Sequence, residues 1–450
     1  MATSLTREQW ATRIGFILAA VGSAVGLGNM WRFPFQVGEE GGAAFLVVYL
    51  LFILLVGLPA MLVEFSLGRN TKRNPVGAVR EFGGDAWRYV GGLFIVIGFV
   101  ILSYYSVVSG WVIRYVIDSF TGAYMDAPGE HFQEIAVGPE AVFFHALFMA
   151  VVVAIVAFGI QRGIELAVKV MVPAIVALLV GLAIYAFTLG GAMDAYSFYL
   201  EPDVGEIGDN WQEVLPSAAG QAFFTLSLGM GVMITYSSYI AEDRNLAEDG
   251  GIIVALDTAI AFIVGLVVFP ILFTAEVDPG EPGAGALFIS VAEAFGDITL
   301  GWLIGALFFG TVLIAALSSA ISLIEVVVSY AIDEHGIDRK RATLGIGAGI
   351  FLLGIPVTYD LAMVDLYDIL AAEILLVSGA ILVVVLVGWL TADRAIGELE
   401  KGIGPLGRWG DAWIWIVRVP LLVVLALVLV LSVLGYVEFL QDEFIPEVLE

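Results

Sequence analysis

The sequence predicts an all-α polytopic membrane protein built from two inverted five-helix repeats, and three observations support this fold class. The chain is 60% hydrophobic and 14% charged, with a mean hydropathy of +0.97, whereas globular chains are about 25% charged. Its apolar segments have roughly the 20 residues that an α-helix needs to cross a bilayer. Glycine-rich runs interrupt two of them, at 22–32 and 225–231. Paired interrupted helices are typical of inverted repeats that enclose a binding site at mid-membrane.

Eleven spans account for the apolar segments. They are expected at approximately 12–36, 42–68, 89–120, 139–159, 165–190, 213–240, 252–275, 298–332, 341–356, 364–391 and 411–437. Spans 1–5 form one repeat (about 12–190), spans 6–10 the other (about 213–391), and span 11 is peripheral. Because five is odd, the repeats insert with opposite topology, and each begins with a discontinuous helix, 1 or 6. We expect residues 1–450 to form a single transmembrane domain.

The basic residues indicate the orientation of the chain. Lysine and arginine occur in alternate loops, such as 69–88, while the intervening loops 121–138 and 201–212 contain none. Basic loops remain in the cytoplasm. We therefore expect a multi-pass cell-membrane protein with a cytoplasmic N-terminus and an extracellular C-terminus.

Composition also excludes some functions. A net charge of −26 argues against nucleic-acid binding, which needs a basic face. Such acidity is typical of proteins from salty surroundings, where ions screen self-repulsion, although an ordinary acidic membrane protein is the alternative. The absence of cysteine excludes disulfides. The three histidines have no metal-binding spacing, and neither H-E-x-x-H nor G-x-S-x-G occurs, so the sequence does not predict an enzyme.

The two breaks carry groups that suit a zwitterion and cations. Carbonyls freed where a helix unwinds can coordinate Na⁺, and freed N–H groups favour a carboxylate. Asn29 adds a side-chain carbonyl, and Thr225, Ser227 and the pair Ser318-Ser319 add hydroxyls. Two structural alternatives remain open: Gly22 and Gly26 also match a G-x-x-x-G packing motif, and serines within a span often bond their own helix.

Ionisable residues at membrane depth are functional candidates. They are Arg32, Glu64, Asp257, Glu325, Asp333, Asp368 and Glu373. Arg32 and Asp368 are expected near the outer ends of their spans and could pair there, as could Arg7 and Asp333 on the inner side. The alternative for each pair is a static salt bridge. Glu373 either couples to protons or lines water.

These residues resemble a known family, the neurotransmitter:sodium symporters, and in particular its eleven-span prokaryotic amino-acid transporters. The matching runs are Trp10-Ala-Thr-Arg13, Gly22 through Pro34, Gly41-Gly42, Tyr104-Tyr105, Ser109-Gly110-Trp111, Gln221 through Gly231 and Ala315 through Ser319. The Gly-Asn-x-x-Arg-Phe-Pro run is highly specific. The resemblance covers roughly residues 7–391 and implies the leucine-transporter-like fold of this family. That fold is a well-known example of inverted repeats with discontinuous membrane helices.

The resemblance also implies roles for individual residues. One Na⁺ site would use Ala24, Asn29, Thr225 and Asp257, and a second would use Gly22, Val25, Ala315, Ser318 and Ser319. The substrate-binding residues would be Ser23, Ala24, Gly26, Ile101, Tyr105, Phe224, Thr225, Ser227, Met230, Ser319 and Leu323. Arg32 with Asp368 would form the outer gate, and Arg7 with Asp333, helped by Trp10 and Tyr239, the inner gate. Glu64 would accept hydrogen bonds from unwound backbone.

The implied activity is Na⁺-driven import of hydrophobic L-amino acids, aliphatic or aromatic, by alternating access with two Na⁺ ions. Gly26 leaves room for a substrate carboxylate, and Met230 between two glycines could yield to a large side chain. Ala261 departs from the family pattern, because it offers neither the hydroxyl that holds chloride nor the acid that replaces it. We therefore expect chloride independence, with Asp257 supplying the negative charge. The alternatives are a Na⁺ symporter of the same fold for another small amine or amino acid, and a transport-deficient sensor. A passive channel is disfavoured by occluding groups such as Phe224, and the oligomeric state is left open.

Overall fold

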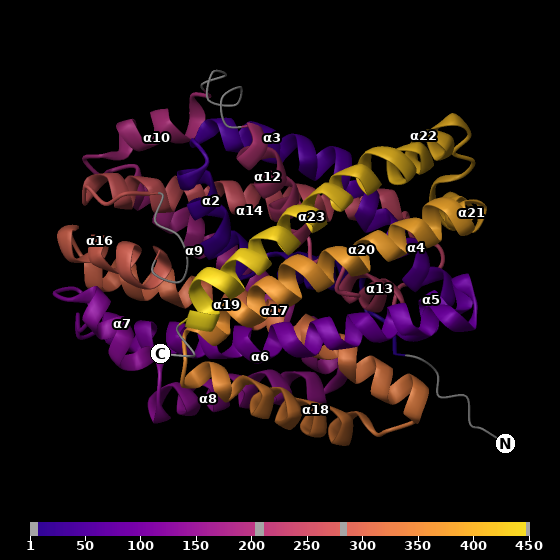
Figure 1. Ribbon diagram of the computed structural model, residues 1–450, viewed down its shortest axis with the longest axis horizontal. Helices are drawn as coiled ribbons and strands as arrows, with labels where there is room; N and C mark the ends of the chain where they lie inside the picture. The colour runs from indigo at the N-terminus through magenta and orange to yellow at the C-terminus, as the bar shows by residue number, and fades with distance from the viewer. Residues whose placement is uncertain (1–7, 203–210, 280–285, 447–450) are drawn as a thin grey trace.

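The computed structural model describes residues 8–202, 211–279 and 286–446, and every regular element in these ranges is helical. Figure 1 shows long helices packed side by side. Short helices gather at the two ends of this bundle. Helices α5 (Pro75–Gly83) and α21 (Ala392–Ile403) lie at one end, and α7 (Pro128–Ala136), α10 (Ala192–Leu200) and α16 (Val291–Asp297) lie at the other.

The first repeat consists of helices that are continuous or nearly so, except at residues 25–27. In chain order, with η marking π- or 3₁₀-helical segments, they are α1 Arg13–Ala24, η1 Gly28–Arg32, α2 Phe33–Glu39, α3 Ala43–Phe52, η2 Ile53–Gly57, α4 Leu58–Thr71, α5, η3 Asp85–Trp87, α6 Arg88–Ser119, α7, α8 Pro139–Ala157, η4 Ile160–Ile164, α9 Glu165–Ala186 and α10.

The second repeat follows the same plan, with its break between α12 and α13. Its elements are α12 Trp211–Thr225, α13 Val232–Ser237, α14 Leu246–Thr274, η5 Ala286–Ser290, α16, α17 Gly301–His335, α18 Arg339–Gly354, η6 Pro356–Thr358, α19 Ala362–Asp368, η7 Ile369–Leu375, α20 Leu376–Val385 and η8 Leu386–Leu390. After it come α21, α22 Arg408–Ile416, η9 Val417–Leu421, α23 Leu422–Phe439 and η10 Leu440–Phe444.

Helices occupy all eleven predicted spans. In the described ranges, 8 unbroken helices are long and apolar enough to cross a membrane, and the pair α1 and η1–α2, bent by 52°, makes a ninth span. The two remaining spans are the divided pair α12–α13 and the 16-residue α18, which are too short to qualify alone. The predicted discontinuous helices 1 and 6 are therefore confirmed.

The two breaks lie against the long central helices α6 and α17. Helix α17 packs on α6 and on α1, and its middle carries buried small residues, including Ala315, Ala316 and Ala320. Small side chains let membrane helices approach closely. The unwound backbone of the first break can therefore touch the serines of α17 directly.

A buried ion pair fastens α21 to the end of α4. Arg69 is 1% exposed and its Nε lies 2.6 Å from an oxygen of Glu398 on α21. Asn70 and Lys401 donate to the other carboxylate oxygen, and Arg69 also donates to the carbonyl of Arg244. Burial alone would raise the pKa of Glu398, but the hydrogen bonds and ion pairs outweigh it and hold this pKa below its usual value.

Candidate functional site

At the first break, the backbone of helix 1 leaves the α-helical hydrogen-bond pattern. Val25 has left helical conformation, with φ −78° and ψ 85°, so its carbonyl is turned away from the axis of α1. The N–H of Leu27 donates to the hydroxyl of Tyr105 on α6, 3.2 Å away. The hydroxyl of Ser319 donates to the carbonyl of Ser23 at 2.8 Å. Side chains of two other helices therefore satisfy the opened backbone, as membrane depth requires.

The second break is a run of strained turns supported by a buried acid. Ser227, Gly229 and Gly231 have φ values of 52°, 77° and 77°, a region that glycine adopts readily and serine rarely. The carboxylate of Glu64, on α4, accepts a hydrogen bond from the N–H of Gly229 at 2.7 Å. Glu64 is 4% exposed. A buried carboxylate therefore contacts unwound backbone at the place where the sequence predicted it.

An enclosed cavity lies between the two breaks, α6 and α17. Its lining is Ser23, Ala24, Gly26, Leu27, Gly28, Ile101, Tyr105, Phe224, Ser227, Met230, Ser319, Ser322 and Leu323. The structure thus brings together every predicted substrate-binding residue except Thr225, which lies on the far side of the break beside Asn29. Sequence reasoning missed Leu27, Gly28 and Ser322. The last of these faces Ser23 across a 2.7 Å hydroxyl contact, although helical spacing from Ser318-Ser319 could have indicated it.

The cavity is tightly closed in this structure. Its free volume is about 30 Å³, far below the 300 Å³ or more that is usual for small-molecule pockets. A Cβ atom at Gly26 would lie 2.3 Å from the hydroxyl oxygen of Ser319 and 3.0 Å from that of Tyr105. An occupant the size of an amino acid would therefore require movement of lining side chains such as Met230 and Phe224.

Asn29, Thr225 and Asp257 converge into one buried cluster. The side-chain nitrogen of Asn29 lies 2.8 Å from Oδ1 of Asp257, and the hydroxyl of Thr225 lies 3.2 Å from its Oδ2 and also contacts Asn29. All three residues are at most 1% exposed. Among the described residues, no basic side chain forms an ion pair with Asp257. A buried carboxylate needs a compensating positive charge, so this oxygen-rich cluster fits a hard cation such as Na⁺.

The second predicted ion position consists of carbonyl and hydroxyl oxygens. Ser318 lies beside Gly22, because a Cβ there would meet its hydroxyl oxygen at 3.6 Å, and this hydroxyl donates to the carbonyl of Ala315 at 2.8 Å. Ser319 contacts the first break from the same helix. Val25 and Ala315 are fully buried. The donor set suits Na⁺, which takes oxygen ligands, and is unsuited to a thiolate- or imidazole-binding metal.

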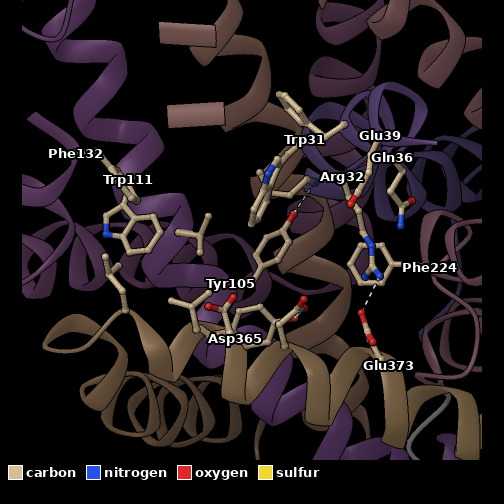
Figure 2. Close-up of a pocket in the computed structure, with 18 residues that line it drawn as sticks. Trp31, Arg32, Gln36, Glu39, Tyr105, Trp111, Phe132, Phe224, Asp365 and Glu373 are labelled. Atoms are coloured by element: carbon tan, nitrogen blue, oxygen red, sulfur yellow. Dashed lines mark hydrogen bonds and ion pairs between the residues drawn. The ribbon is translucent and has the colours of Figure 1, made fainter. Parts of the chain in front are cut away.

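A larger vestibule of about 450 Å³ adjoins the enclosed cavity. Leu27, Gly28, Tyr105 and Phe224 line both spaces, so these four residues, including the Phe224 ring, form their shared wall. Figure 2 shows Arg32 beside this ring and directed toward Glu373. The guanidinium carbon lies 5.1 Å from the ring centroid, a cation–π distance.

The predicted outer pair of Arg32 with Asp368 is not formed in this structure. Arg32 instead forms a 3.0 Å ion pair with Glu373, while the hydroxyl of Tyr104 donates to Asp368 at 2.5 Å. The cause is the π-helical segment η7, which inserts one residue per turn. It thereby brings Glu373, five residues after Asp368, onto the vestibule side of the helix. A sequence does not reveal a π turn, so α-helical spacing misplaces this residue.

The inner end is held by a network only part of which was predicted. Trp10 donates from its indole to the carbonyl of Tyr236 at 2.9 Å, and Tyr239 donates to the buried Glu325 at 2.7 Å. Arg339 pairs with Glu325 through both Nη atoms, at 2.7 and 3.1 Å, and reaches Glu8 at 3.2 Å. Sequence reasoning missed the roles of Glu8 and Arg339; the basic run Arg339-Lys340-Arg341 after α17 was the available signal.

Of the predicted inner pair, Arg7 with Asp333, only Asp333 lies within the described residues. Asp333 accepts hydrogen bonds from the backbone and side-chain nitrogens of Asn74, at 3.0 and 3.3 Å. It therefore joins the loop before α5 to the end of α17.

The structure also describes the position at which many members of the resembled family hold chloride, to which Tyr49, Gln221, Thr225 and Ala261 correspond in this chain. Tyr49 and Ala261 are fully buried, and Gln221 donates to the carbonyl of Gly28 at 3.1 Å. The methyl group of Ala261 supplies no anion ligand, as the sequence indicated.

Comparison with known proteins gives this geometry its context. The profile of the sodium:neurotransmitter symporter family matches residues 7–134 and 136–446. The chain belongs to this family. It is therefore a sodium-dependent, multi-pass membrane transporter and not an enzyme.

Individual relatives cover almost the whole chain. The uncharacterized sodium-dependent transporter YhdH of Bacillus subtilis is 33% identical over 95% of this chain and 98% of its own length. The sodium-dependent serotonin transporter of Drosophila melanogaster is 28% identical over 98% of this chain and 79% of its own. The crystal structure of MhsT in complex with L-phenylalanine superposes with a TM-score of 0.85, at 39% identity, covering 95% of this chain and 99% of MhsT. The fold expected from the family resemblance is therefore confirmed.

Proposed function

We propose that this sodium-dependent transporter imports hydrophobic L-amino acids, aliphatic or aromatic, by alternating access. The observation that carries the proposal is the composition of the enclosed cavity. Its lining includes the apolar side chains of Ile101, Met230 and Leu323, and also the Tyr105 hydroxyl, which lies near the open backbone at Gly26. An apolar side chain and an α-carboxylate are complementary to these two kinds of lining group. The relative MhsT, solved with L-phenylalanine, supports the same substrate class.

In this proposal the backbone breaks bind the polar end of the substrate. Tyr105 donates its hydroxyl hydrogen to the substrate carboxylate, and Gly26 provides space for it. Ser23, Ala24, Phe224, Ser227 and Ser319 complete the substrate site, with Thr225 behind them. The ring of Phe224 moves over the bound side chain when the vestibule closes.

Two Na⁺ ions are proposed to drive import. One is held by Ala24, Asn29, Thr225 and Asp257, and the convergence of three of these side chains around a buried carboxylate supports it. The other is held by Gly22, Val25, Ala315, Ser318 and Ser319. Each inward Na⁺ gains about 2.3 kcal/mol per 100 mV of membrane potential, and two would support roughly a thousandfold accumulation. Chloride is not required, because Asp257 supplies negative charge near Ala261.

The repeats, about 12–190 and 213–391, act as one transport unit with the helix near 411–437 at its edge. The N-terminus is cytoplasmic and the C-terminus extracellular, because the basic loops are those on the N-terminal side. Arg32 and Asp368 then belong to the outer gate, and Trp10, Tyr239, Arg7 and Asp333 to the inner gate. Glu64 supports the second break.

The decisive experiment is uptake into proteoliposomes of labelled leucine, phenylalanine and tryptophan. Na⁺ outside with K⁺ inside is compared with K⁺ on both sides. Saturable uptake that requires the Na⁺ gradient supports the proposal. Na⁺-dependent binding without accumulation would identify a sensor, and failure of all three amino acids to bind would overturn the substrate class in favour of another small amine or amino acid. The control is Asn29→Ala, which removes a proposed Na⁺ ligand.

A further inference from the structure

Glu373 is a half-buried acid that the proposed transport cycle does not use. Its side chain and that of Arg32 are 29% and 26% exposed, and they pair at 3.0 Å within the vestibule. On the other side of this pair lies a second cavity of about 270 Å³, which both residues also line. Gln36 and Phe224 also line both spaces, so the Arg32–Glu373 pair is part of the wall shared by the vestibule and this side cavity.

Helix α23 forms the far wall of the side cavity. Val428, Leu431, Ser432 and Gly435 line it from α23, and Pro216 and Gly220 from α12. Ser432 and Gly435 are small, so space for the Glu373 side chain remains between η7 and α23. The peripheral eleventh span thus helps to build the environment of a gate residue. In Figure 1, α23 lies along α20, the helix that continues η7.

Two carboxylates on one helix, those of Asp368 and Glu373, have different partners in this open vestibule. Asp368 accepts from Tyr104, at 2.5 Å, and Glu373 holds Arg32. The π-helical η7 places both acids on the vestibule, about one turn apart, with Glu373 the deeper of the two. Arg32 carries one charge and a long flexible stem, so it can reach a neighbouring acid by rotating its side chain.

We propose that Glu373 is the partner of Arg32 in the open vestibule, and that the outer gate closes by transfer of Arg32 from Glu373 to Asp368. Glu373 is then a positioning residue, which holds the guanidinium against Phe224 and away from Asp368 until the substrate arrives. The proposal rests on the alternating-access cycle above, but it does not depend on which solute is carried.

The natural absence of cysteine makes this proposal directly testable. A single reporter, Leu361→Cys, introduces a thiol at the rim of the vestibule, and a membrane-impermeant maleimide measures its exposure in Na⁺ without substrate. Glu373→Gln should slow labelling about fivefold, since Arg32 then favours Asp368; a fivefold shift corresponds to about 1 kcal/mol. Asp368→Asn should be labelled at the wild-type rate or faster. The double variant Glu373→Gln/Asp368→Asn should be labelled faster than Glu373→Gln alone.

Control variants distinguish a specific effect of Glu373 from a general loss of charge, from misfolding and from an incorrect substrate proposal. Glu39→Gln removes another vestibule carboxyl and should label at the wild-type rate. If Glu373→Gln is not recovered folded, Glu373→Asp, which keeps the charge but shortens the side chain, should label at an intermediate rate. Wild-type or faster labelling of Glu373→Gln, or of Glu373→Asp where only that variant folds, would overturn the proposal. If the gate variants behave as expected but no hydrophobic amino acid is transported, only the proposed substrate fails.

Discussion

Substituting Gly26 with alanine tests how the first break packs against α17. The added Cβ would lie 2.3 Å from the hydroxyl oxygen of Ser319 and 3.0 Å from its Cβ. Rotating the hydroxyl away relieves the first contact but not the second, and it breaks the 2.8 Å hydrogen bond to the carbonyl of Ser23. The break or α17 must therefore shift.

The magnitude follows from two costs. A lost hydrogen bond costs about 1 kcal/mol, and overpacking costs about 1–3 kcal/mol. If these costs fall on the ligand-bound state, they total about 2–4 kcal/mol, which weakens binding roughly 30- to 1000-fold. The shift also displaces a proposed Na⁺ ligand, so the Na⁺ concentration needed for binding should rise.

Equilibrium binding of labelled leucine over a Na⁺ titration measures both effects, with thermal unfolding recorded alongside. Gly310→Ala is the matched control, because it lies on the same helix as Ser319 and a Cβ there meets nothing within 4 Å. The double variant Gly26→Ala/Ser319→Ala should show strongly non-additive losses. Wild-type affinity and Na⁺ dependence in Gly26→Ala would refute the packing argument.

Further predictions concern the ion positions and the α21 contact. Asn29→Ala and Ser319→Ala should each raise the half-saturating Na⁺ concentration for substrate binding, and unchanged Na⁺ dependence in both would contradict the two ion positions. Asp257→Asn should create a chloride requirement or abolish uptake; normal uptake in chloride-free buffer would show that the charge balance is wrong. Glu398→Gln should destabilise the protein by about 3–5 kcal/mol in thermal or denaturant unfolding, since it leaves the buried Arg69 without its counter-charge. Because the folded-state pKa of Glu398 is lowered, its stabilising contribution is present above its ordinary pKa and lost as pH falls through the folded value; an equal acid dependence in wild type and Glu398→Gln would contradict this.

The arrangement of the fold was largely predictable because membrane spans depend on length and apolarity, which a sequence displays directly. The breaks were predictable for a similar reason, since clustered glycines and polar residues at membrane depth have few other uses. Most residues of the enclosed cavity came from the family resemblance, and they lie together because both breaks face α6 and α17. Thr225 was the exception, because the turn at the end of α12 directs it toward Asp257.

The gates were predicted less well, since they depend on side-chain partners rather than on spacing. Arg32 had two acids within reach on one helix, and only the π-helical turn of η7 decided between them. At the inner end, Arg339 enters from α18 to meet Glu325, a pairing between helices that no local pattern specifies.

The sequence by itself determined the membrane class, the two broken helices and the family, because hydrophobic length and backbone-breaking residues act locally. The tertiary structure alone decided which carboxylate holds Arg32, which hydroxyls meet the opened backbone of helix 1, and how α21 and α23 contact the transport core. These outcomes depend on the rotation of each helix about its axis and on one inserted residue in η7. Only packing of the assembled helices fixes both.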